Sequence, residues 1–162
     1  MDITAWRTEV WHPLTVHFPV ALLLFATLAK LVALLLNPTA SVFWNRMGSC
    51  LLYAGCVGAW VSIYTGDLAD GIVSRKLCDP TVLKDHEIAA FNMAYLFSAA
   101  TVLDLAMLLN VLRVQTRLFG LVLALLMVTG SGFLVYTGHL GASVVYEQAG
   151  GVNVPSSDCA GF

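Results

Sequence analysis

The sequence predicts an all-helical integral membrane protein whose four helices cross the bilayer in an up-down bundle. Hydrophobic residues make up 59% of its 162 residues and charged residues only 11%, whereas ordinary soluble domains carry roughly 25% charged residues. Four apolar stretches match the ~20 residues that a helix needs to cross a hydrocarbon core. We expect one domain, residues 1–162, with helices at 14–36, 47–68, 88–112 and 118–138 and a surface tail at 147–162.

The boundaries between the predicted helices are polar or contain proline. Asn37-Pro38-Thr39 ends the first stretch, because proline lacks a backbone N–H and lipid offers the freed carbonyl no other partner. The segment 67–87 is a longer polar connection, and residues 113–117 form a short hairpin before the last stretch. The net charge of −2 gives no reason to expect nucleic acid as a partner, so the lipid bilayer is the first partner expected.

An even number of crossings places both termini and the 67–87 connection on one side of the membrane. The two short hairpins on the other side carry basic residues without acids: Arg46, Arg113 and Arg117. Basic residues near helix ends favour the cytoplasmic side, so both termini and the long connection are expected outside. Cys78 and Cys159 then share an outer compartment in which disulfides persist, and we expect them to tie the tail to the long connection.

The chain also repeats itself. Tyr-Thr-Gly occurs near the end of the second stretch at residues 64–66 and near the end of the fourth at 136–138. A nearly constant offset superposes three further pairs: His12 on His86, Thr27 on Thr101 and Lys30 on Asp104. This pattern predicts two parallel helix hairpins related by an axis along the membrane normal. We expect Lys30 and Asp104 to form an intramembrane ion pair, with outward snorkelling of Lys30 as the alternative.

All four histidines fall at the predicted outer end of the bundle. They are His12, His17, His86 and His139. An imidazole in an apolar layer needs a partner for each ring nitrogen, or one nitrogen must bind a metal. We therefore expect these four residues to bind a metal or a cofactor. Histidines at helix ends can instead cap the helix or bond to backbone carbonyls, and that alternative stays open.

Haem b is the cofactor that best suits an apolar bundle, because two imidazoles from different helices hold the iron among apolar side chains. Four histidines allow one or two haems, with His12 and His86 as one possible pair and His17 and His139 as the other. A bare copper or zinc ion is the alternative. Carboxylates near the histidines favour it: Asp67, Asp85 and Glu87.

The segment His12-Pro-Leu-Thr-Val-His17-Phe-Pro19 resembles the opening signature of a bacterial membrane family called domain of unknown function 2231. The segment 138–152, with its glycines, Val-Tyr pair and Gly-Gly-Val, is similar to the closing motif of that family, and His86 matches the histidine that opens its third helix. The resemblance implies a four-helix domain in the bacterial inner membrane. Relatives joined to Rieske or cytochrome c modules imply a redox context.

The leading hypothesis is a b-type cytochrome subunit that carries electrons between a redox protein on the outer side and quinone or another subunit of a complex. A c-type cytochrome or another redox subunit is the expected partner. We expect the chain to be at most a non-catalytic or electron-transfer subunit of an oxidoreductase complex. Two alternatives stay open: a copper or zinc handling protein, and a structural anchor in a larger membrane complex.

Overall fold

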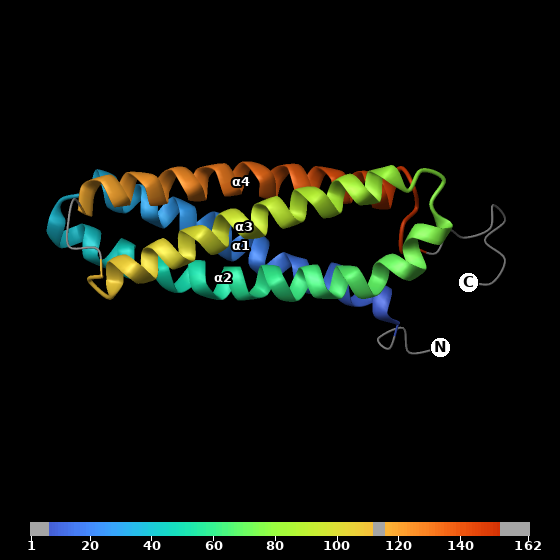
Figure 1. Ribbon diagram of the computed structural model, residues 1–162, viewed down its shortest axis with the longest axis horizontal. Coiled ribbons are helices and arrows are strands. Elements are labelled where there is room, and N and C mark those ends of the chain that lie inside the picture. Colours follow the sequence, from blue (N-terminus) through green and yellow to red (C-terminus); the bar gives the residue numbers. More distant parts are fainter. Residues whose placement is uncertain (1–6, 112–115, 153–162) are drawn as a thin grey trace.

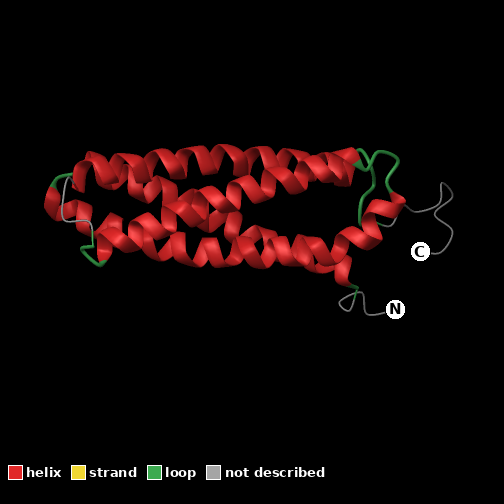
Figure 2. Ribbon diagram, in the orientation of Figure 1, coloured by secondary structure: helices red, strands yellow, loops and turns green. Residues whose placement is uncertain are grey.

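Residues 7–111 and 116–152 are described by the computed structural model, and within them the chain folds into four long helices (Figures 1 and 2). These are α1 (Thr8–Leu35), α2 (Pro38–Val73), α3 (Thr81–Leu108) and α4 (Thr116–Tyr146), with a short 3-10 turn η2 (Ser74–Lys76) after α2. Each of the four is long and apolar enough to cross a membrane. The predicted all-helical, up-down membrane bundle is confirmed.

The helices extend beyond most of the predicted bounds. α1 begins at Thr8 rather than at residue 14, and α4 continues to Tyr146 rather than to 138, because the prediction followed only the apolar stretches and helices continue into the polar surroundings. α3 begins at Thr81 rather than at residue 88, but it ends at Leu108 rather than at 112. Asn110 follows with a φ of 54°, a left-handed conformation that asparagine tolerates and that ends a helix.

The turn between α1 and α2 is much shorter than predicted. Asn37 caps α2, since its side-chain oxygen accepts a hydrogen bond of 3.0 Å from the backbone N–H of Ala40. Pro38 is the first residue of α2, a position where its fixed φ suits a helix and its missing N–H has no helical partner to lose. The same Asn-Pro pair therefore ends α1 and starts α2. As a result Arg46 lies inside α2, not in a hairpin.

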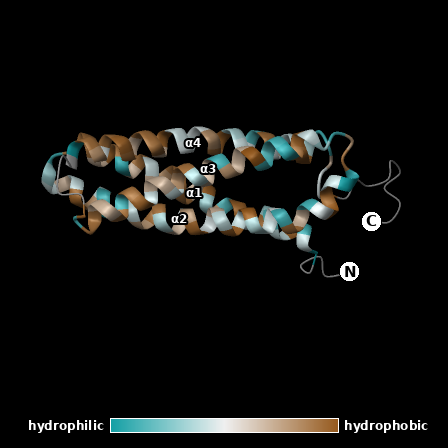
Figure 3. Cartoon of the chain, viewed as in Figure 1, coloured by the Kyte–Doolittle hydropathy of each residue, from teal (hydrophilic) through white to brown (hydrophobic). Residues whose placement is uncertain are grey.

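Figure 1 shows how the helices are arranged along the bundle. The α1–α2 turn and the end of α3 lie at one end, and the start of α1, the α2–α3 connection and the end of α4 lie at the other. Apolar residues run along all four helices (Figure 3). The largest fully buried side chains are Leu23, Leu52, Phe97 and Met127, one from each helix. The core therefore lies on the common axis of the bundle.

Two glycines bring the helices of each hairpin close together in the same way. A Cβ added at Gly55 of α2 would lie 2.8 Å from the Leu23 side chain of α1, and one added at Gly130 of α4 would lie 3.0 Å from Phe97 of α3. Leu23 corresponds to Phe97 under the offset that relates His12 to His86. The two hairpins therefore pack as repeats, each more extensively within itself than against the other.

Candidate functional site

Two histidines, one from each hairpin, meet at the end of the bundle that holds the α2–α3 connection. The ring centroids of His12 on α1 and His86 on α3 are 6.0 Å apart, and the ring planes are nearly perpendicular at 86°. Nδ1 of His12 lies 2.8 Å from the carbonyl oxygen of Ser62 on α2. Nδ1 of His86 lies 2.9 Å from the carbonyl oxygen of Thr137 on α4. The two halves of the site are thus built alike.

The carbonyl partners determine where the proton sits on each ring. A carbonyl oxygen only accepts hydrogen bonds, so Nδ1 of His12 and of His86 must carry the proton and donate it. In the neutral imidazole, Nε2 then has a free lone pair, which is the form that binds a metal. Metal-ligating histidines commonly donate their other ring N–H to a carbonyl or carboxylate in this way.

Each ring also lies against a glycine of the neighbouring helix in its own hairpin. A Cβ added at Gly66 would be 3.2 Å from Nδ1 of His12, and one added at Gly141 would be 3.1 Å from Cε1 of His86. Gly66 thus corresponds to Gly141, and not to Gly138 as the Tyr-Thr-Gly motifs suggested. That motif similarity is not a structural equivalence, because its spacing is out of register with the histidine contacts.

Hydroxyl groups hold the His12 half of the site in place. Thr65 donates a hydrogen bond of 2.9 Å to the carbonyl of Ser62, the same oxygen that accepts from His12. Thr15 donates to the carbonyl of His12 at 3.1 Å, and its hydroxyl lies 3.0 Å from that of Thr65. The Thr15 and Thr65 hydroxyls therefore lie against each other across the α1–α2 interface, beside the imidazole.

The other two histidines do not join this pair. His17 and His139 are exposed on α1 and α4. His17 follows His12 by five residues, which at ~3.6 residues per turn places it on a different face of α1. Within residues 7–111 and 116–152, no group of three or more His, Cys, Asp and Glu side chains is placed to hold a metal ion. The four histidines and the carboxylates therefore do not form one cluster.

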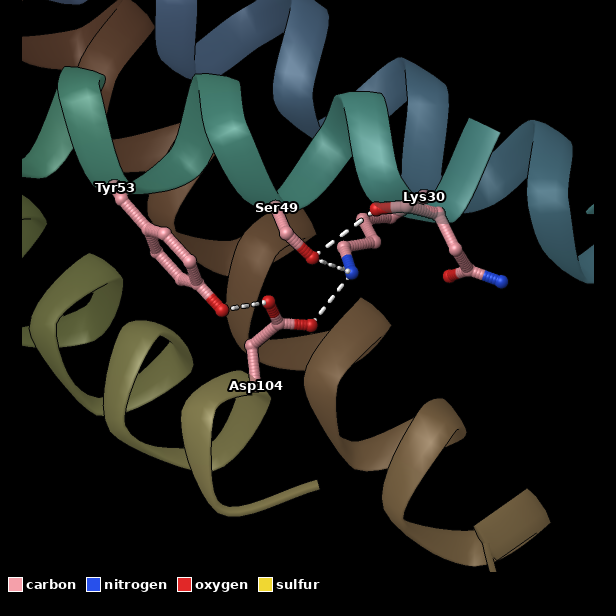
Figure 4. A network of polar contacts seen from close by, with 5 residues as sticks. Lys30, Ser49, Tyr53 and Asp104 are labelled. Atoms are coloured by element: carbon pink, nitrogen blue, oxygen red, sulfur yellow. Dashed lines mark hydrogen bonds and ion pairs between the residues drawn. The ribbon is translucent and has the colours of Figure 1, made fainter. Parts of the chain in front are cut away.

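A second polar group lies in the other half of the bundle, near the α1–α2 turn (Figure 4). Lys30 and Asp104 are only 6% and 5% exposed, and their ion pair spans 2.5 Å. Lys30 also donates to the Ser49 hydroxyl at 2.8 Å, and the Tyr53 hydroxyl donates to the second carboxylate oxygen of Asp104 at 2.7 Å. Lys30 thus points into the bundle and does not snorkel outward. The charged groups of Lys30 and Asp104 both have partners from other helices, while the Ser49 hydroxyl donates to the Asn45 carbonyl of its own helix at 3.1 Å.

The α2–α3 connection is bound to the segment after α4. The backbone N–H of Asp79 donates to the side-chain oxygen of Gln148 at 3.1 Å. Hydrogen bonds from the hydroxyl and backbone N–H of Thr81 hold the pKa of the Asp79 carboxyl below its usual value. Cys78 lies in the same connection. Its expected partner Cys159 is outside the described residues, so the disulfide stays a prediction.

The sequence analysis missed two functional groups at this site, the backbone carbonyls of Ser62 and Thr137. No residue type encodes them, since every residue carries a carbonyl. A partial signal was available in the glycines, because Gly66 and Gly141 lie one turn after these carbonyls on α2 and α4. A histidine on one helix and a glycine on the next, repeated in both hairpins, is the pattern that could have located the pair.

The helices and the paired imidazoles together define a multi-pass, four-helix membrane protein with a two-fold repeated polar site. The chain belongs to the family described as a predicted membrane protein, DUF2231, whose match covers residues 9–154. This match confirms the resemblance carried by the opening and closing motifs. No curated protein and no solved structure matches the chain.

Proposed function

We propose that the protein is a membrane-embedded b-type cytochrome subunit in which His12 and His86 would hold one haem. It carries electrons between a redox protein on the outer side and quinone or another subunit. The observation that supports this function is the pair of imidazoles from different hairpins, each fixed through Nδ1 to a backbone carbonyl.

The separation of the two rings suits an iron between them. A metal–imidazole bond is about 2 Å long, so two imidazoles on opposite sides of one metal have ring centroids roughly 6 Å apart. The centroids of His12 and His86 are 6.0 Å apart. An edge-to-face contact between two bare rings has a similar separation, and the optical spectrum distinguishes these two cases.

The number of imidazoles favours haem over a bare ion. A haem iron takes its other four ligands from the porphyrin and needs only two from the protein, as His12 and His86 supply. A zinc or copper site takes three or four protein ligands. In the described part of the chain no third His, Cys, Asp or Glu side chain completes such a set. A structural anchor would need neither haem nor metal.

The proposed orientation places the haem near the outer surface of the bacterial inner membrane. The histidine pair lies at the end of the bundle that carries the α2–α3 connection. Arg46 of α2 and Arg117 of α4 lie towards the opposite end, and basic residues there favour the cytoplasm for that end. A c-type cytochrome or another redox subunit on the outer side would then approach within a few turns of the haem. Acidic residues at that end, including Asp67 and Asp70, would attract a basic partner.

A reduced-minus-oxidised optical spectrum of the purified protein tests this function. Bands of a b-type haem are expected from the native chain, and His12→Ala and His86→Ala should each strongly weaken the low-spin bands, because each variant removes one of the two imidazole ligands. His17→Ala and His139→Ala are matched controls, since both side chains are exposed away from the pair, and they should keep the bands. A folded protein without iron would contradict the proposal, and stoichiometric zinc or copper in its place would support the alternative.

A further inference from the structure

A hollow of about 440 Å³ lies on the surface of α2, near the α1–α2 turn. Its lining residues have the spacing of one helix face: Thr39, Val42, Phe43, Arg46, Met47 and Cys50. Among these six side chains, Thr39 and Arg46 carry the strongly polar groups. The Phe43 ring forms one wall and packs edge to face against Trp44, with ring centroids 5.7 Å apart. The hollow is thus mainly apolar, with a single positive charge.

Arg46 lies at the depth where lipid headgroups meet the hydrocarbon core. α2 has 36 residues, which at ~1.5 Å per residue is ~54 Å, whereas the hydrocarbon core is ~30 Å thick. A helix centred in the bilayer therefore extends ~12 Å beyond the core at each end, and Arg46 is about eight residues, or ~12 Å, from the first residue of α2. Trp44 agrees with this depth, because tryptophan is enriched at the membrane–water interface.

Arg46 lacks an anionic partner in the part of the chain that the structure describes. It is exposed, and among the described residues it forms no hydrogen bond or ion pair. Asp104 is the one acidic residue in segments 14–66 and 88–146, and it is buried against Lys30. The other acids precede residue 14, lie between 67 and 87 or follow residue 146. A second copy in the same orientation would likewise bring no exposed carboxylate to this depth.

The two ends of the hollow differ in polarity. A helix side chain leans towards the N-terminus of its helix, so the Arg46 guanidinium leans towards Thr39 and the membrane surface. Met47 and Cys50 lie on the other side of Arg46, up to ~6 Å deeper in the core. The occupant therefore needs an anionic oxygen group at the surface end and an apolar chain at the deeper end. A phospholipid with a net negative headgroup has both.

We propose that this hollow binds one anionic phospholipid, with its phosphate on the Arg46 guanidinium and the upper part of an acyl chain against Val42, Phe43 and Met47. Arginine forms two parallel hydrogen bonds with a phosphate, which orient the headgroup as well as attract it. This end faces the cytoplasm in the orientation proposed above, and the cytoplasmic leaflet has a negative surface potential from anionic lipids. The site is independent of the histidine pair, which lies at the other end of the bundle.

Native mass spectrometry of the full chain in a non-ionic detergent tests the site, because it counts both lipids and chains. Titration with palmitoyl-oleoyl phosphatidylglycerol should reach a plateau at one lipid per chain. Phosphatidylcholine with the same acyl chains should bind about fivefold more weakly, since its choline offsets the phosphate charge. Arg46→Gln should weaken phosphatidylglycerol binding about tenfold through the lost charged hydrogen bonds. Val42→Trp should also weaken it, because the larger ring fills the hollow while the charge stays.

Arg117→Gln is the matched control. Arg117 is an exposed arginine in the first turn of α4, at the same end of the bundle (Figure 1), and it does not line the hollow. Its variant should keep the native affinity, and circular dichroism should show native helix content in all three variants.

Native affinity in Arg46→Gln would overturn the site. An equal loss in Arg117→Gln would also overturn it, because the lipid would then respond to the charge of the whole surface. So would displacement of the lipid by an equal concentration of glycerol phosphate, since the acyl chain would then contribute nothing. A dimer that binds no lipid would contradict the proposal as well, because a second copy would then cover the hollow.

Discussion

Lys30→Met should destabilise the protein by about 3–5 kcal/mol, because removing one partner of a buried ion pair leaves the other charge uncompensated. Asp104 is 5% exposed and would keep only the Tyr53 hydroxyl as a close donor. Methionine has nearly the length of lysine, so the space beside Gly48, where the lysine stem lies, remains filled. Unfolding of the purified protein in detergent, followed by circular dichroism, measures the effect.

The double variant Lys30→Met with Asp104→Leu separates charge from packing. Replacing both partners of a buried pair by apolar residues of similar volume is often neutral or stabilising, so the double variant should recover most of the stability lost in the single one. Lys84→Met is a matched control, because Lys84 forms its ion pair with Glu87 in an exposed position. Native stability in Lys30→Met, or a double variant no more stable than the single one, would show that the pair does not hold the two hairpins together.

Gly66→Ala and Gly141→Ala should each weaken haem binding by about 10–100-fold, the usual effect of disturbing the groups that orient a metal ligand. The new methyl groups would lie 3.2 Å from Nδ1 of His12 and 3.1 Å from Cε1 of His86, so each ring must shift. Such a shift weakens the hydrogen bond from Nδ1 of the ring to the carbonyl oxygen of Ser62 or Thr137. This hydrogen bond fixes the orientation of the ring. Haem titration of the purified apoprotein, followed by absorbance, measures the affinity.

Gly71→Ala is the control for both substitutions. Gly71 also lies in α2, but a Cβ added there meets nothing within 4 Å, and alanine has a higher helix propensity than glycine. Haem affinity should therefore stay at the native value. Equal affinity in all three variants would mean that the glycines do not set the positions of the imidazoles.

The fold could be predicted from the sequence because lipid imposes a simple rule: a spanning segment must be helical and about 20 residues long. Pro38 indicated the break between α1 and α2, because proline lacks a backbone N–H and lipid offers the freed carbonyl no other partner. The ends of the helices could not be obtained in this way, since the polar turns beyond the bilayer carry no hydropathy signal. Thr8 and Tyr146 therefore lie well outside the predicted spans.

The candidate site could be predicted only in part. Topology alone brings His12, His17, His86 and His139 to one end of the bundle, but the direction in which each ring points depends on its face of the helix. His17 and His139 point outward, and only His12 and His86 meet. The inward position of Lys30 was signalled by the repeat, which aligns it with Asp104. The bonds that hold the rings go to backbone carbonyls, which any sequence would provide.

Electron paramagnetic resonance of the oxidised, purified protein tests most directly whether His12 and His86 hold one iron between them. One low-spin ferric haem signal per chain, of the kind given by two imidazole ligands with nearly perpendicular planes, is the predicted result. A high-spin haem signal, which indicates that one axial ligand is missing, or a folded protein without iron would contradict it.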